Sequence, residues 1–134
     1  LVEANPDSLA IDFLIKREAG FPDKVQIDRE RIGQVVWNLL ENSRVACDKY
    51  NGKITACIAS IGDSDSFSVS ILDNGSGISP ENFNTIFQPF FTTKTKGTGL
   101  GLAICQRIIQ AHHGSLVAEN HANNGAKFTF SLPK

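Results

Sequence analysis

Residues 53–72 read KITACIASIGDSDSFSVSIL, and this stretch decides the fold that we expect. Apolar and polar side chains alternate over 53–61 and again over 66–72, which is the period of half-buried strands. The polar residues 62–65 between them favour a turn. The two strands are therefore predicted to pair as a hairpin.

Further strands are predicted toward both ends of the chain. Two alternating segments, 115–120 and 126–132, enclose a turn around residues 123–125 and predict a second hairpin. Near the other end, a strand over 10–17 is predicted to turn back toward a short strand at 25–27. The chain therefore begins and ends with strands.

Three helices are predicted between these strands. Asp28 can cap a helix whose apolar residues recur at helical spacing over 28–49. A short helix is expected over 79–87, and a second long one over 99–113 that stops at Gly114. The order of elements lacks the regular repeat of a doubly wound parallel sheet. We expect an α/β (α+β) two-layer sandwich, in which three helices cover one face of a mixed, mostly antiparallel sheet.

Length and charge narrow the class of protein. The chain has 134 residues, so we expect 1–134 to form a single domain. A formal net charge of -1 leaves no global basic field for binding nucleic acid. No apolar run approaches the roughly 20 residues that cross a bilayer, and no signal-peptide pattern precedes the strands. We expect a soluble, cytoplasmic domain without direct membrane contact, whose three cysteines are reduced core thiols.

Two glycine-rich stretches flank an unperiodic segment at 90–98. The first is DNGSGI at 73–78 and the second is GTGLGL at 97–102, which opens a helix. Glycine lets backbone approach a ligand closely, and a helix N-terminus offers unpaired N–H groups to phosphate oxygens. The second stretch matches neither the P-loop nor the dinucleotide-binding pattern. A phosphate site is one interpretation, and simple turns are the other.

Asn38 and Asn42 lie four residues apart, hence on nearly the same face of the first long helix. An amide oxygen is a hard, neutral ligand that suits magnesium. The alternative is that both are ordinary amides on the helix surface.

Five boxes together resemble the catalytic and ATP-binding domain of sensor histidine kinases, which belongs to the superfamily of gyrase, heat-shock chaperone, histidine kinase and mismatch-repair ATPases. The resemblance spans roughly residues 28–134, in the family's order and spacing. The boxes are NLLENS at 38–43, DNGSGI at 73–78, FQPFF at 87–91, GTGLGLAI at 97–104 and GAKF at 125–128.

The resemblance implies a role for each matching residue of the base and metal sites. Asp73 would accept a hydrogen bond from the adenine 6-amino group. Asn42 would hold magnesium, with Asn38 in support near the phosphates. The first glycine box would let the backbone pass close to the base and would supply part of its apolar wall, through Gly75, Gly77 and Ile78.

A short ATP lid is implied as well. It would fold over the triphosphate, with Lys94 supplying positive charge. Phe87, Phe90 and Phe91 would form the apolar hinge on which it moves, and the alternative is that they are plain core residues. The lid residues proper would be Gly97, Thr98, Gly99, Leu100, Gly101 and Leu102. Many family members carry a lysine where this chain has Val45. Its absence is similar to the nitrogen-regulatory branch, and Arg44, Lys49 or Lys96 could also replace the charge.

The implied activity is transfer of the ATP γ-phosphoryl group to a histidine on a separate dimerisation domain, and then to a response regulator. That acceptor domain and the sensor would lie elsewhere in a homodimeric parent, while this domain would be monomeric. Asn38 stands where the superfamily's hydrolases have a glutamate base, and an amide cannot take a proton, so transfer is favoured over hydrolysis. Two alternatives stay open: a protein serine kinase of the anti-sigma-factor type, and a non-catalytic ATP-sensing module.

Overall fold

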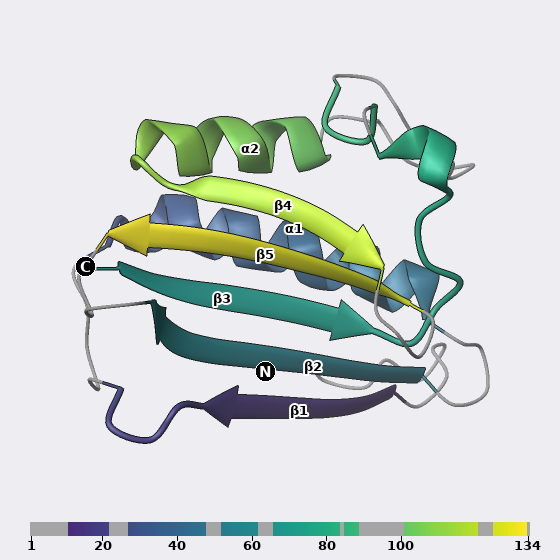
Figure 1. Ribbon diagram of the computed structural model, residues 1–134, viewed down its shortest axis with the longest axis horizontal. Coiled ribbons are helices and arrows are strands. Elements are labelled where there is room, and N and C mark those ends of the chain that lie inside the picture. The colour runs from purple at the N-terminus through teal and green to yellow at the C-terminus, as the bar shows by residue number, and fades with distance from the viewer. Residues whose placement is uncertain are drawn as a thin grey trace.

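The computed structural model describes residues 11–21, 27–47, 52–61, 66–83, 85–88, 101–120 and 125–133. Within them, five strands form one sheet in the order β1-β2-β3-β5-β4 (Figure 1). The strands are β1 (Ile11–Arg17), β2 (Gly52–Ile61), β3 (Ser66–Asp73), β4 (Ser115–Asn120) and β5 (Ala126–Pro133).

Both predicted hairpins are confirmed. β2 pairs antiparallel with β3, β4 pairs antiparallel with β5, and β3 and β5 join the two hairpins antiparallel at the centre. The start of the chain differs from our prediction, because β1 pairs parallel with β2 at the edge of the sheet. Of the strand predicted at 25–27, only Ile27 is described, and it is irregular. Strand pairing depends on residues far along the chain, which local turn signals do not reveal.

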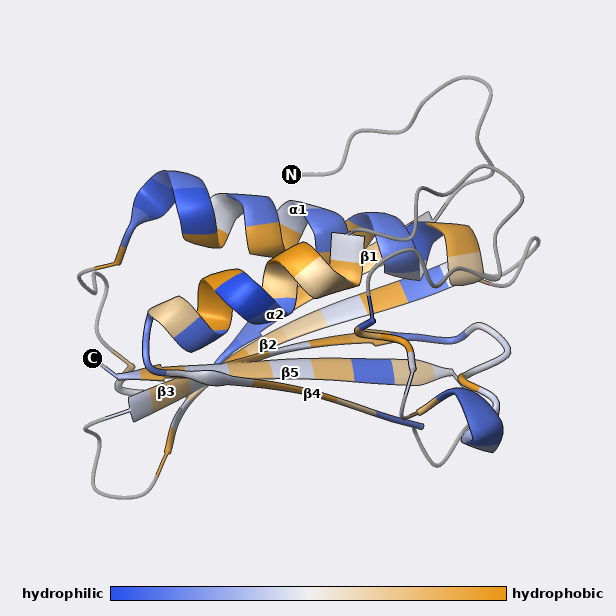
Figure 2. Cartoon of the chain, turned by 90° about the horizontal axis from the view of Figure 1, so that it is seen from above, coloured by the Kyte–Doolittle hydropathy of each residue, from blue (hydrophilic) through white to orange (hydrophobic). Residues whose placement is uncertain are grey.

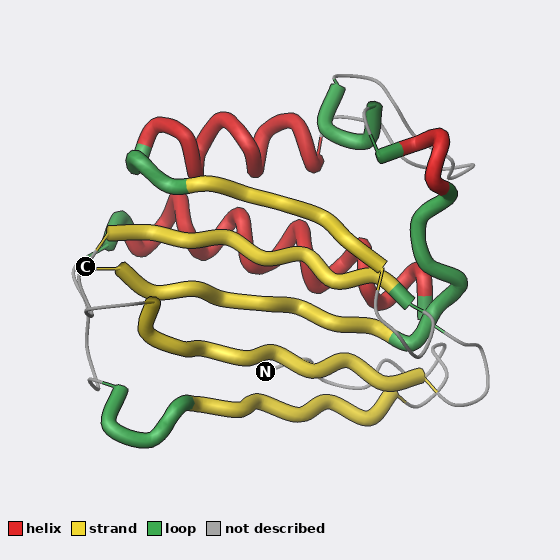
Figure 3. The backbone as a smooth tube through the Cα atoms, in the orientation of Figure 1, coloured by secondary structure: helices red, strands yellow, loops and turns green. Residues whose placement is uncertain are grey.

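Two α-helices, α1 (Arg29–Ala46) and α2 (Gly101–Ala111), lie on one face of the sheet (Figure 2). The side of α1 that faces the sheet is hydrophobic and its outer side hydrophilic. The expected sandwich class is confirmed, but the three covering helices are not. The third is only a 3₁₀ turn, η1 (Pro80–Asn82), beyond the strand ends (Figure 3). The Ser79 side chain makes no capping hydrogen bond there, so the proline alone starts the turn.

Local signals fix the helix ends. Asp28 caps α1, because its Oδ1 accepts the N–H of Arg31 at 3.1 Å. α1 ends at Ala46, earlier than predicted, because the next residue is extended. α2 ends in a left-handed turn at His113 (φ 63°). The following Gly114 is needed for contact with β5, since a Cβ there would lie 1.9 Å from the Ser131 carbonyl oxygen.

The core lies between the helices and the sheet. Its members alternate along β3 and β5 and recur along the inner faces of α1 and α2, and they include Val35, Leu39, Phe67, Ile71, Ile109, Phe128 and Phe130. On the face of the sheet away from the helices, hydroxyls pair across strands, as Ser70, which is buried, does with Thr129 at 3.1 Å. All three cysteines are free, but only Cys105 is fully buried. In the described part of the chain, no helix is both long enough and apolar enough to span a bilayer.

Candidate functional site

Asp73 ends β3 and is buried, with 5% of its surface exposed. Its Oδ1 accepts two backbone N–H groups, from Gly75 at 2.9 Å and from Ala126 at 3.1 Å. Its Oδ2 is also buried, and it has no hydrogen-bond partner among the residues that the structure describes. The carboxyl group is thus held by one oxygen and keeps the other available, which is the arrangement expected where a ligand supplies the missing donor.

Both glycines of the first box are required by contacts within the protein. A Cβ on Gly75 would lie 1.8 Å from the carbonyl oxygen of Ala46, at the end of α1. Gly77 has a φ of +81°, and a Cβ there would lie 2.8 Å from Oδ1 of Asn120. The loop after β3 therefore touches α1 on one side and β4 on the other. Whether these glycines also approach a base stays a prediction.

The hairpin β4–β5 contributes two further residues to this site, and the sequence did not indicate one of them. The Asn120 side chain binds both backbone groups of Ile78, and Gly125 (φ +102°) lies against the backbone of Asp73. Of these, only Gly125 carried a signal, because it opens the last box. A single asparagine at a strand end has no pattern that would have found Asn120.

The two asparagines of α1 are both half-buried. Asn42 lies one turn before Ala46, so it stands on the helix end that contacts the loop after β3. Asn38 lies one turn earlier and hydrogen-bonds the thiol of Cys105 on α2. Burial raises the pKa of Cys105 to about 11, and the hydrogen bond from Asn38 offsets this only in part. Cys105 is therefore a neutral core thiol at physiological pH.

The positive charge expected near the phosphates is only partly described. Val45 is 52% exposed, and the neighbouring Arg44 is paired with Glu41, with Nη2 to Oε2 at 2.9 Å. This hydrogen bond and the charge of Glu41 raise the pKa of Arg44. Arg44 is thus engaged by Glu41, which weakens Arg44 as a candidate for a phosphate contact. The same ion pair leaves Glu41, the carboxylate next to Asn42, a poor candidate for a general base. Lys49 lies outside the described residues.

Most of the predicted ATP lid also falls outside the described residues, namely Phe91, Lys94, Lys96, Gly97, Thr98, Gly99 and Leu100. Gly101 is described as the first residue of α2, and beyond its own turn of helix no described atom lies within 4 Å of where its Cβ would stand. Leu102 is half-buried and packs on the core. Gly101 therefore begins α2 at an open position, and Leu102 anchors the start of the helix to the core.

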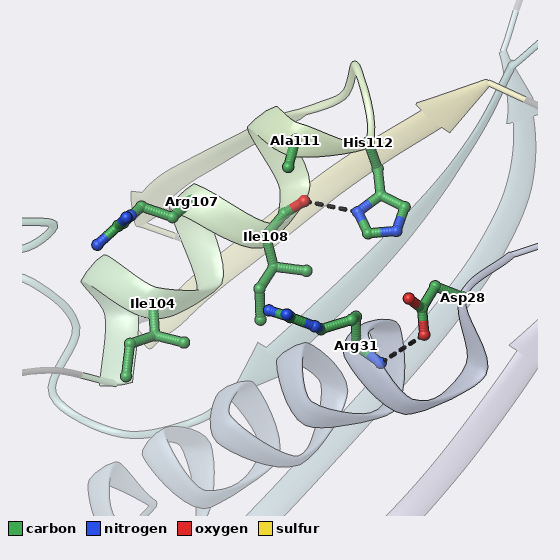
Figure 4. A pocket seen from close by; sticks show the side chains of 7 residues that line it. All are labelled: Asp28, Arg31, Ile104, Arg107, Ile108, Ala111 and His112. Carbon is green, nitrogen blue, oxygen red and sulfur yellow. Dashed lines mark hydrogen bonds between the residues drawn. The ribbon is translucent and has the colours of Figure 1, made fainter.

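A pocket of about 550 Å³ lies between the first turn of α1 and one side of α2 (Figure 4). Arg31 and Asp28 line it from α1, at the opposite end of that helix from Ala46. This pocket is therefore separate from the predicted nucleotide residues. His112 at its edge contacts the Ile108 carbonyl oxygen through Nδ1 at 2.7 Å, so its ring is engaged by the end of α2. Among the described residues, no three His, Cys, Asp or Glu side chains cluster as a metal site.

The C-terminal ends of α1 and β3 and the N-terminal end of α2 all lie at one end of the sandwich (Figure 1). Residues 27–134 match the family described as histidine kinase-, DNA gyrase B-, and HSP90-like ATPase. The chain belongs to this family of ATPases, as its motifs indicated.

Sensor histidine kinases are the most informative relatives. The sensor histidine kinase ZraS of Klebsiella oxytoca is 42% identical over 110 residues, which cover 82% of this chain and 23% of ZraS. The solved catalytic domain of histidine kinase ThkA has a TM-score of 0.79 and 41% identity, over 92% of this chain and 79% of that one. ThkA in complex with response regulator protein TrrA gives a TM-score of 0.77 and 38% identity, over 92% of this chain and 34% of that one. The chain is thus a catalytic, ATP-binding domain of the sensor histidine kinase kind, and it spans about a quarter of ZraS.

Proposed function

We propose that the chain binds ATP and Mg²⁺ between the end of α1 and the predicted lid, and that it phosphorylates a histidine on a separate dimerisation domain. The observation that carries the proposal is the buried Oδ2 of Asp73, which has no partner among the described residues. An adenine 6-amino group would supply the missing donor. The family match to ATPases supports the same nucleotide.

The fixed carboxylate would select adenine over guanine. Its Oδ1 is held by two backbone N–H groups, so the side chain cannot turn away to suit another base. Guanine presents an acceptor oxygen where adenine presents a donor, so Oδ2 would face an acceptor. The loss of a charge-assisted hydrogen bond of about 1.5–3 kcal/mol predicts at least tenfold weaker binding of GTP.

Asn42 is the proposed magnesium ligand. Its amide is half-buried on the helix turn next to the carboxylate loop, and an amide oxygen has the hardness that Mg²⁺ prefers. When bound, the ion would neutralise phosphate charge. Asn38 is the proposed support: one N–H of its amide is engaged by Cys105, and the second N–H of the same group is the donor available to a phosphate oxygen. Lys94 and residues 97–102 are the proposed phosphate and lid contacts.

Phosphoryl transfer suits these residues better than hydrolysis. Asn38 occupies the position of the hydrolases' glutamate base and cannot accept a proton. Glu41 is held by Arg44. We therefore propose that a partner domain supplies the acceptor histidine and its proton acceptor. A homodimeric parent and onward transfer to a response regulator are part of this proposal, and the ThkA complex with TrrA supports that kind of partner. The absence of a lysine at Val45 supports the nitrogen-regulatory branch.

Titration calorimetry tests the nucleotide proposal. ATP with Mg²⁺ should bind the wild type at least tenfold more tightly than GTP with Mg²⁺, and Asn42→Ala should weaken magnesium-ATP binding with little change in unfolding free energy. Glu41→Gln is the matched control on the same helix and should bind ATP as the wild type does. A wild type that takes up no adenine nucleotide, with or without magnesium, would overturn the proposal.

A trans assay tests the transfer. The chain is mixed with the parent's dimerisation domain and γ-labelled ATP, and the label is followed through acid and base treatment. Acid-labile phosphohistidine is the expected product. Acid-stable phosphoserine would favour the serine kinase alternative, and ATP binding without any label would favour a sensing module.

A further inference from the structure

Asn120, the last residue of β4, pairs with a residue 42 positions earlier in the chain. Its Oδ1 accepts the N–H of Ile78 at 2.7 Å, and its Nδ2 donates to the Ile78 carbonyl oxygen at 2.9 Å. One side chain thus satisfies both backbone groups of Ile78. In a sheet, the backbone of a neighbouring strand would provide these two hydrogen bonds. Here the side-chain amide of Asn120 provides them instead.

The loop from β3 to Ile78 leaves room for the Asn120 amide, because it has a glycine at position 77. Gly77 precedes Ile78, and any Cβ at Gly77 would lie 2.8 Å from Oδ1 of Asn120 and 3.5 Å from the Gly125 carbonyl oxygen. At the other end of the loop, the N–H of Ala126 holds Oδ1 of Asp73 at 3.1 Å. The β4–β5 hairpin is therefore hydrogen-bonded to the loop at two points, Asp73 and Ile78.

We propose that Asn120 is a positioning residue for the nucleotide base. By holding Ile78 it would fix the apolar wall at a set distance from the free Oδ2 of Asp73, so that a purine fits between them. This inference rests on the proposed function, because it assumes that the base binds there. Asn120 acts through Ile78 and need not touch the nucleotide.

An asparagine suits this role better than its closest replacements. It offers one acceptor and one donor at short reach, and these match the N–H and C=O of a single residue. Aspartate would keep the bond from the Ile78 N–H but would turn a carboxylate oxygen toward the Ile78 carbonyl, where two acceptors repel. Serine would keep at most one of the two bonds.

The test compares ATP with inosine triphosphate, whose 6-oxo group faces Asp73 as an acceptor. Titration calorimetry with Mg²⁺ is carried out on the 134-residue chain as wild type, Asn120→Asp and Glu119→Gln. Glu119→Gln is the matched control, because it removes one charge from the adjacent residue, whose ion pair with Lys127 is long at 3.8 Å and solvent-exposed. Thermal unfolding of each variant reports how much stability is lost.

Asn120→Asp should bind ATP about tenfold more weakly, because the hydrogen bond from Nδ2 to the Ile78 carbonyl oxygen is replaced by a repulsion between two acceptors. The preference for ATP over inosine triphosphate should shrink as well, because Ile78 is no longer held at a fixed distance from Oδ2 of Asp73. Glu119→Gln should match the wild type in both. Asn120→Ser should fall between, and it provides the comparison if Asn120→Asp does not fold.

Two results would overturn the inference while leaving the proposed function intact. One is ATP binding by Asn120→Asp within twofold of the wild type. The other is equal weakening of both nucleotides with the preference unchanged, which is what a structural role alone would produce. A wild type that binds neither nucleotide would overturn the inference together with the proposed function.

Discussion

The carbonyl oxygen of Ala46 lies 1.8 Å from the position that a Cβ on Gly75 would occupy. The end of α1 and the loop after β3 are therefore in backbone contact, and only a glycine permits it. This contact joins the helix that carries Asn42 to the loop that begins at Asp73. The two halves of the proposed site are held together at one point.

Gly75→Ala is expected to lower the free energy of unfolding by about 2–4 kcal/mol, because the added methyl group meets backbone that cannot move aside easily. Urea denaturation measures this. The matched control is Gly33→Ala, at an exposed position in the second turn of α1 where the new Cβ would have no described neighbour within 4 Å beyond its own helix, and it should raise stability by about 0.5–1 kcal/mol. Equal stability of the two variants would contradict the contact.

Two substitutions at Asp73 separate its structural role from its binding role. Asp73→Ala leaves the N–H groups of Gly75 and Ala126 without their acceptor and should cost about 2–4 kcal/mol of stability. Asp73→Asn keeps an oxygen for those donors, so it should fold nearly as well but lose at least tenfold in ATP affinity. Denaturation and calorimetry on the same samples check this. Wild-type ATP affinity in a folded Asp73→Asn variant would remove the carboxylate from the base site.

Asp28→Ala removes the side-chain cap of α1 and should cost about 1 kcal/mol of stability. Asp28→Ser supplies another good capping oxygen and should restore most of the loss. Urea denaturation of the three proteins is sufficient. Because the cap lies at the far end of α1 from Asn42, ATP affinity should be unchanged, and a large loss of affinity in Asp28→Ala would contradict this separation.

Stability should fall at alkaline pH because of Cys105. Burial raises its pKa from 9.0 to about 11, so between these values the unfolded chain loses the thiol proton and the folded chain keeps it. The contribution is complete below pH 9 and is lost as pH rises toward 11, amounting to about 2–3 kcal/mol. Denaturation of the wild type and Cys105→Ala from pH 7 to 11 measures it. Parallel pH curves for the two proteins would show that the thiol does not contribute.

The sequence predicted those parts of the fold that are encoded by neighbouring residues. The alternation in β2 and β3, the capping Asp28 and the stop at Gly114 all act within a few positions, and the structure places each as expected. The parallel pairing of β1 with β2 was missed, because a strand carries no local mark of its partner. The helix expected over 79–87 shrank to one 3₁₀ turn, since its proline start lacked a side-chain cap.

At the candidate site, too, neighbouring residues indicated some features and tertiary packing determined the others. The order of the motifs alone indicated the family and named Asp73, Asn42 and the two glycine-rich stretches. Only the tertiary structure decided which oxygen of Asp73 is held and which is free, and that Asn38 bonds Cys105. It also brought Asn120 to Ile78 across 42 residues. Periodicity and motifs depend on neighbours along the chain, whereas these hydrogen bonds depend on the packing of the β4–β5 hairpin and two helices around one loop.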